Sequence, residues 1–196
     1  LYPSSKTLVK DCVASRIFAK DDTLYDFSDN AQEFAKNFMG WTDLASTPPC
    51  PLDEIKSFAA EQIADGLKTV VLVGQGGSTQ ASMTITKYNK IDGGSVQFRT
   101  IDSDSPVRLR ALFSEIDPAH TVFIHSSKSG GTIEPRLIMS AIRDILATLM
   151  PEDEIPRHLI AITDPGSALA QQANDEGWLG LFYGEPSVGG RYSALS

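Results

Sequence analysis

From Thr69 onward, short apolar runs alternate with segments of helical periodicity. The run Thr69–Val73 is continuously apolar after its first residue, as in strands that are buried on both faces of a sheet. Further strands are predicted around 96–101, 121–124, 159–162 and 179–183, each preceded by a helical segment. Strands that alternate with helices form a parallel, doubly wound sheet with helices on both faces. The sequence therefore predicts an α/β fold with five parallel strands, and in a 2-1-3-4-5 order the first and third strands are neighbours.

The first 66 residues have a different pattern, which we interpret as an N-terminal helical flank. Helices are predicted over 7–19, 29–39 and 51–66 from their apolar spacing. This divides the chain into a flank, 1–66, and a sheet domain, 67–196. The aromatic residues of the flank are expected to pack between helices: Phe34, Phe38 and Trp41.

The connection between the third strand and the next helix is the most informative loop of the chain. Residues 126–132 read Ser-Ser-Lys-Ser-Gly-Gly-Thr, and the pattern from Thr132 to Met150 is helical. The first turn of a helix has unpaired N–H groups and a partial positive charge, so it favours an anion. The loop therefore predicts a phosphate site, and the alternative is an ordinary connection with Thr132 as N-cap. The apolar positions expected on one face of the helix are Ile133, Leu137, Ala141, Ile145 and Leu149.

A second glycine-rich loop, residues 74–78, follows the first strand and reads Gly-Gln-Gly-Gly-Ser. A dinucleotide site is the alternative interpretation, but Thr79 replaces the third glycine of that fingerprint. Asp102 also lies further along than the roughly 20 residues expected for a ribose-binding acid. Because ligands of doubly wound sheets lie at the carboxyl ends of strands, we expect this loop and 126–132 to share one site.

Composition excludes several classes of function. A net charge of −8 argues against nucleic acid or an anionic membrane as a partner, because both require a basic face. No apolar run reaches the roughly 20 residues of a membrane span, and no signal-peptide pattern opens the chain. Cys12 and Cys50 are too few for a disulfide framework or a zinc site, so we expect no metal and a cytoplasmic location. Because the chain starts without methionine and stops at Ser196 within a motif, we expect a piece of a longer protein.

Three motifs together resemble the glucose-6-phosphate isomerase (phosphoglucose isomerase) family. They are the glycine loop 74–78, the stretch 127–134 and Gly-Gly-Arg-Tyr-Ser at 189–193. Lesser matches, at 16–21, 101–106 and 163–167, are most similar to the isomerase part of bifunctional transaldolase/glucose-6-phosphate isomerases. The resemblance implies a sugar isomerase (SIS) fold, with a five-stranded parallel sheet between helices.

The resemblance also implies the members of a substrate site that needs no cofactor. They are Ser127, Lys128, Ser129 and Thr132 for the sugar phosphate, Gly77 and Ser78 in the first loop, Glu134 at the sugar end, and Arg191 as the catalytic arginine. Arg191 falls on the arginine that stabilises the developing enediolate. A guanidinium suits that role because it stays charged at all working pH values.

The family reaction moves a proton between C2 and C1 of the open hexose through an enediol. Its glutamate base, and the histidine and lysine that assist ring opening, follow the Gly-Gly-Arg-Tyr-Ser motif, so we expect the base to lie beyond Ser196. His120, His125 and His158 are not proposed as substitutes, and His125 is expected to make a structural hydrogen bond at a strand end. Glu134 at a helix N-terminus would be held in its charged form and would be a weak base.

We therefore expect the chain to bind hexose 6-phosphate weakly without isomerising it. We expect the complete enzyme to act in glycolysis and gluconeogenesis, and the family resemblance makes a homodimer a possible form of it. The main alternative is a non-catalytic SIS module that senses sugar phosphates in a regulator or amidotransferase. A third is a structural α/β domain with inert loops, and loss of hexose phosphate binding in Ser127→Ala or Thr132→Ala would exclude it.

Overall fold

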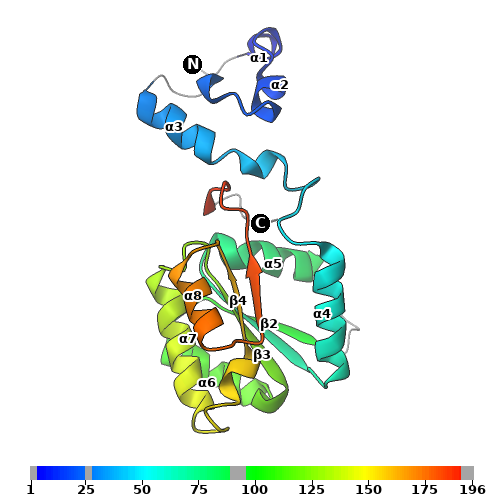
Figure 1. Ribbon diagram of the computed structural model, residues 1–196, viewed down its shortest axis with the longest axis vertical. Coiled ribbons are helices and arrows are strands. Elements are labelled where there is room, and N and C mark those ends of the chain that lie inside the picture. The colour runs from blue at the N-terminus through cyan, green and yellow to red at the C-terminus, as the bar shows by residue number, and fades with distance from the viewer. Residues whose placement is uncertain (1–3, 25–27, 89–95, 191–196) are drawn as a thin grey trace.

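A five-stranded parallel sheet forms the centre of the molecule (Figure 1). The structure is a computed structural model that describes residues 4–24, 28–88 and 96–190. The strand order β2-β1-β3-β4-β5 confirms the predicted doubly wound topology, with β1 hydrogen-bonded to both β2 and β3. The strands are Thr69–Val73 (β1), Gln97–Ile101 (β2), Thr121–Ser126 (β3), Leu159–Thr163 (β4) and Gly180–Tyr183 (β5).

Helices precede the sheet and connect its strands. The α-helices are Ser5–Lys10 (α1), Val13–Phe18 (α2), Asp29–Asn37 (α3), Leu52–Ala64 (α4), Gly77–Tyr88 (α5), Pro106–Glu115 (α6), Ile133–Leu146 (α7) and Ala168–Asp175 (α8). Short 3-10 helices are Asp22–Leu24 (η1), Gly40–Thr42 (η2), Pro118–His120 (η3) and Ile155–His158 (η4).

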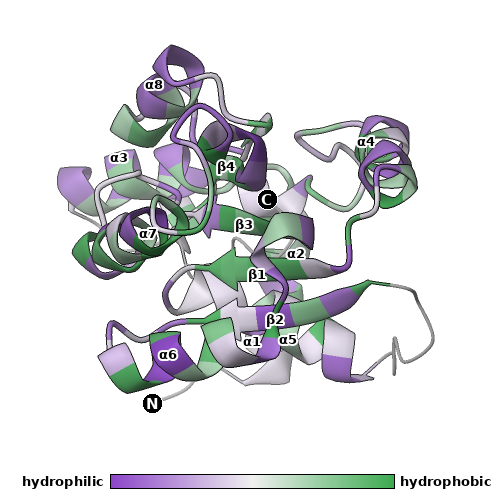
Figure 2. Ribbon diagram, turned by 90° about the horizontal axis from the view of Figure 1, so that it is seen from below, coloured by the Kyte–Doolittle hydropathy of each residue, from purple (hydrophilic) through white to green (hydrophobic). Residues whose placement is uncertain are grey.

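The main hydrophobic core lies between one face of the sheet and helices α6, α7 and α8. Alternate strand residues point to this face, including Val71 of β1 and Phe123 of β3, which are register partners and fully buried. In Figure 2 the strands β1 and β3 are largely hydrophobic, whereas the helices around them mix hydrophobic and hydrophilic residues. The burial of continuous apolar strands between helix layers is the reason that these segments lack alternation.

The opposite face of the sheet carries α4 and α5. Phe58 of α4 contacts Phe182 of β5 in a T-shaped arrangement, with ring centroids 5.3 Å apart. Beside α4 an apolar groove of about 300 Å³ extends over the strands, lined among others by Val122, Ile124 and Ile160. Helix α4 therefore packs on the sheet, although it belongs to the predicted flank 1–66. The domain division at residue 66 stays a prediction.

Helix α7 turns a different face to the core from the predicted one. Ile133, Leu137 and Leu149 are 62%, 53% and 57% exposed. An unbroken four-residue spacing advances about 40° beyond each full turn, so from Ile133 to Leu149 it drifts by about 160° around a helix. Apolar residues that are separated alternately by three and four positions stay on one face of a helix. The buried residues of α7 follow that rule: Pro135, Ile138, Met139, Ile142 and Leu146.

The prediction of a single helix over 7–19 is also wrong, because this segment forms two helices. Helix α1 ends at Lys10 and α2 begins at Val13, and between them Cys12 adopts a left-handed conformation with φ of 50°. Helices α1, α2 and α3 contain no buried residues and lie at one end of the molecule, apart from the sheet (Figure 1).

Candidate functional site

A cleft opens at the carboxyl ends of β1 and β3, where the strand order reverses. Its volume is about 660 Å³, and both of the loops singled out in the sequence line it. Of the expected site residues, the structure brings five together there: Gly77, Ser78, Lys128, Ser129 and Thr132. This is the position at which doubly wound sheets hold their ligands.

Two helix N-termini point into this region. Helix α5 begins at Gly77, and α7 begins at Ile133 with Thr132 as its N-cap. The Thr132 side chain makes no capping hydrogen bond, so its hydroxyl is not used within the helix. Aligned helix dipoles place partial positive charge at both N-termini. The two ends together favour an anion without requiring a positively charged side chain.

Gly130 fixes the shape of the serine loop, residues 126–132. Its φ of +66° lies in the left-handed region that favours glycine. A Cβ atom at this position would lie 2.9 Å from Leu169 Cβ and 3.0 Å from the Leu169 backbone nitrogen, at the start of α8. The loop is therefore fitted closely against the neighbouring strand-to-helix connection.

Ser127 lies beneath the loop and is 3% exposed. Its N–H donates to the Ile162 carbonyl at 3.0 Å, and its carbonyl accepts from the Gly130 N–H at 3.1 Å. Among the described residues its Oγ has no hydrogen-bond partner. A buried hydroxyl without a partner is destabilising by about 1–3 kcal/mol, and a hydrogen bond to a ligand or a water molecule would remove this cost.

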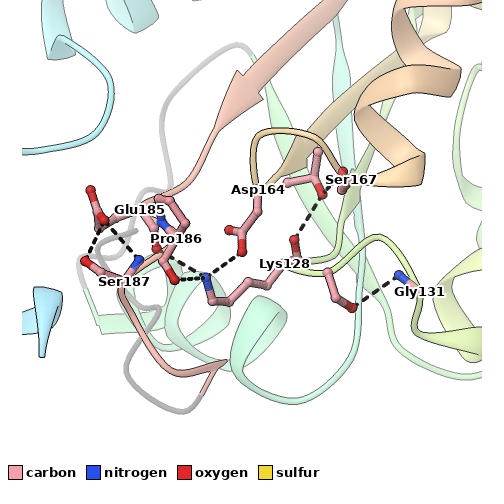
Figure 3. A network of polar contacts seen from close by, with 9 residues as sticks. Lys128, Gly131, Asp164, Ser167, Glu185, Pro186 and Ser187 are labelled. Carbon is pink, nitrogen blue, oxygen red and sulfur yellow. Dashed lines mark hydrogen bonds and ion pairs between the residues drawn. The ribbon is translucent and has the colours of Figure 1, made fainter. Parts of the chain in front are cut away.

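The Lys128 side chain is turned toward the ends of β4 and β5 (Figure 3). Its Nζ donates to Asp164 Oδ2 at 2.7 Å and to the carbonyls of Glu185 and Pro186 at 3.2 and 3.1 Å. The ion pair is largely enclosed, with 20% and 22% of the two side chains exposed. Because Asp164 neutralises Lys128, an anion placed in the cleft would interact mainly with N–H groups and helix ends.

Sequence reasoning missed Asp164, which also lines the cleft. Its second oxygen, Oδ1, is buried and has no hydrogen-bond partner among the described residues. The residue follows β4, and β4 is the neighbour of β3 in the sheet. Parallel strands end at the same edge, so the position of Asp164 directly after a predicted strand was a usable signal. Gln75 of the glycine loop also lines the cleft, and two further lining residues were not expected: Phe38 and Pro186.

The other three expected site residues are not among those seen to line the cleft. Ser127 is buried beneath loop 126–132, and Glu134 lies in the first turn of α7. Arg191 lies outside the described residues, although the preceding Gly190 is part of the cleft wall.

His125 faces away from the cleft, toward the core beneath α7 and α8. It is 2% exposed, and its ring stacks on Trp178 with centroids 6.5 Å apart. The prediction that His125 makes a structural hydrogen bond is wrong, since neither of its ring nitrogens has a partner among the described residues. Burial, and secondarily the charge of Arg136, lowers the pKa of His125 to about 4, so the ring is neutral at pH 7.

Metal and membrane signals were searched within residues 4–24, 28–88 and 96–190. No group of three or more potential metal ligands occurs there. Within the same ranges, no helix combines the length and apolar character of a bilayer span.

The sheet order and the two loops at its switch point define a doubly wound α/β protein whose cleft lies at that switch point. Residues 53–196 match the family model Phosphoglucose isomerase. The chain therefore belongs to the phosphoglucose isomerase family.

Several known proteins are similar to it. Glucose-6-phosphate isomerase of Acaryochloris marina is 30% identical over 171 residues, covering 79% of this chain and 32% of the relative. The enzyme of Carboxydothermus hydrogenoformans is 28% identical over 170 residues, covering 82% and 36%. The chain thus spans about a third of the length of the curated relatives it matches.

Solved structures agree on the fold. A hypothetical protein from Thermus thermophilus superposes with a TM-score of 0.74 and 26% identity, covering 96% of this chain and 41% of that one. A glucose-6-phosphate isomerase from Chlamydia trachomatis superposes with a TM-score of 0.62 and 21% identity over 91% and 32% of the two chains.

Proposed function

We propose that this chain supplies the hexose 6-phosphate-binding part of a glucose-6-phosphate isomerase that acts in glycolysis and gluconeogenesis. The observation that carries the proposal is the meeting of the glycine loop and the serine loop in one cleft at two helix N-termini. Its volume of about 660 Å³ falls within the range of roughly 300–1,000 Å³ that small-molecule sites occupy.

In this proposal the phosphate group lies on the serine loop. Within the described residues, the backbone N–H groups of Lys128 and Ser129 have no hydrogen-bond partner and can donate to phosphate oxygens. The hydroxyls of Ser127 and Thr132 add neutral donors. Neutral donors hold a dianion without forming the strong ion pairs that would slow its release.

The sugar then extends toward α5 and the end of β5. Gly77 and Ser78 at the start of α5 face its reacting end, Glu134 supports it, and Arg191 stabilises the enediolate charge. Such a fixed donor next to developing negative charge can lower the barrier by several kcal/mol, about 3 in measured cases.

The proton-transferring base is proposed to lie outside these 196 residues. The only carboxylate among the described residues that line the cleft is Asp164, and no histidine is among them. One oxygen of Asp164 is already hydrogen-bonded to the Lys128 ammonium, so this carboxylate is committed to an ion pair. The chain alone should bind hexose 6-phosphate and should not isomerise it. Association as a homodimer and fusion to a transaldolase belong to the proposal for the longer protein.

A calorimetric titration with fructose 6-phosphate, with fructose as the control ligand, tests the proposal. Ser127→Ala and Thr132→Ala should each weaken binding by about 10- to 100-fold, because each removes one hydrogen bond to a charged group worth about 1.5–3 kcal/mol. Thr148→Ala, a matched change of an exposed threonine after the end of α7, should leave binding unchanged.

Equal affinity for fructose and fructose 6-phosphate would refute a phosphate site. If the phosphate is required but a longer polypeptide that continues past Ser196 fails to isomerise it, a non-catalytic sensor module is the better description.

A further inference from the structure

The ammonium group of Lys128 has no donor left for a substrate. A lysine ammonium carries three N–H donors. Three acceptors lie within hydrogen-bond distance of Nζ: one oxygen of Asp164 and the carbonyls of Glu185 and Pro186. To reach a phosphate on the serine loop, Nζ would have to leave these acceptors and expose the Asp164 carboxylate to the incoming anion.

The main chain of Lys128 is held toward the same side. Its carbonyl accepts from the Asp164 N–H at 2.9 Å and from Thr163 Oγ1 at 3.1 Å. Thr163 Oγ1 in turn lies 2.8 Å from Ser167 Oγ, and the Thr163 carbonyl accepts from the Gly184 N–H at 3.0 Å. Lys128 is therefore joined to the ends of β4 and β5 through both its backbone and its side chain.

Segment 184–190, which follows β5, is held on two sides. On one side are the two hydrogen bonds from Lys128 (Figure 3). On the other, the Gly40 N–H donates to the Ser187 carbonyl at 2.9 Å, and Met39 forms an antiparallel bridge with Val188. The segment contributes Pro186 and Gly190 to the cleft wall, and Arg191 follows Gly190 directly in the sequence.

We propose that Lys128 is a positioning residue. Together with Asp164, its side chain holds segment 184–190, which leads into Arg191, against the serine loop. Its contribution to phosphate binding is then limited to its backbone N–H. The inference rests on the proposed function and separates two roles that a lysine in a phosphate loop could have, ligand or anchor.

A charge-neutral double variant, Lys128→Met with Asp164→Asn, distinguishes the two roles. It removes the anchor and leaves the net charge of the cleft unchanged, whereas Lys128→Met alone would leave Asp164 to repel the phosphate. If Lys128 is an anchor, the double variant should bind fructose 6-phosphate within about threefold of the wild type. If the ammonium binds phosphate, the affinity should fall by roughly 10- to 100-fold. The matched control is Lys56→Met with Asp53→Asn, the same change in an exposed ion pair of α4.

Amide hydrogen exchange provides the readout of positioning. In the wild type, fructose 6-phosphate should slow exchange in segment 184–190, because the segment forms part of the cleft wall. In the double variant, exchange there should be faster, and the bound ligand should no longer slow it, while strand β1 keeps its protection. Unchanged exchange in segment 184–190, or the large loss of affinity, would overturn the inference.

Two outcomes keep this test separate from that of the proposed function. If the wild-type chain does not bind fructose 6-phosphate, the proposed function fails. If it binds and the double variant loses binding, only the positioning role fails. If the double variant does not fold, Asp164→Asn alone decides between the two roles. If Lys128 is an anchor, exchange in segment 184–190 should be faster than in the wild type, because one of the three acceptors of Nζ is weakened. If Lys128 is a phosphate ligand, exchange in that segment should not change.

Discussion

Replacing Gly130 with alanine should destabilise the protein through two separable terms. The first is conformational: a non-glycine residue at φ of +66° costs about 1–2 kcal/mol. Part of that cost, about 0.4–1 kcal/mol, is offset because alanine restricts the unfolded chain. The second term is steric, since the new Cβ would lie 2.9 Å from Leu169 Cβ and 3.0 Å from its backbone nitrogen. Overpacking of this kind costs typically about 1–3 kcal/mol.

The structure offers a matched control for the conformational term. Gly177, after α8, has φ of +64°, and a Cβ there would meet no atom within 4 Å. Gly177→Ala should therefore cost only the net backbone term, about 0.5–1.5 kcal/mol. Gly130→Ala should cost that amount and the steric term, in total about 1.5–4.5 kcal/mol.

Urea unfolding of the two variants and the wild type measures the difference. Gly130→Ala should be less stable than Gly177→Ala by about 1–3 kcal/mol, with unchanged slopes against denaturant. It should also weaken fructose 6-phosphate binding, because the serine loop has to move to accommodate the methyl group. Equal destabilisation by the two substitutions would refute the argument that the loop is pressed against α8.

Two further predictions concern the core. Ile142→Ala, at a fully buried position of α7, should lower the free energy of unfolding by about 2–5 kcal/mol, whereas Leu137→Ala on the exposed face should cost much less; similar losses in urea unfolding would contradict the assigned face. The second concerns pH. Because the pKa of His125 is about 4 in the folded protein and about 6.5 when unfolded, the unfolded chain binds more protons between these values, and stability should fall as the pH falls through this window, by up to about 3 kcal/mol. His125→Phe should lose less stability than the wild type between pH 7 and pH 4.5, and an unchanged pH dependence would show that the histidine is not the source.

Much of the fold could be read from local patterns. The apolar run Thr69–Val73 and the later runs predict strands because buried parallel strands have no polar face. Glycines and serines after two of those runs predict the loops at the switch point, because strand order and connection handedness leave few alternatives for where they lie. The cleft at the ends of β1 and β3 is thus largely a consequence of sequence order.

The buried face of α7 agrees with spacings of three and four, since Ile138 and Ile142 are buried and Leu137 lies in solvent. The tertiary structure decided which charged groups meet. The partner of a lysine charge cannot be inferred from the neighbours of that lysine in the chain. The Lys128 ammonium bonds to residues 36, 57 and 58 positions away, and these become neighbours only when β4 and β5 join the sheet. The sequence therefore determined the strands, their loops, the location of the cleft and the spacing that marks the buried face of α7. Long-range packing alone determined the partners of the Lys128 ammonium.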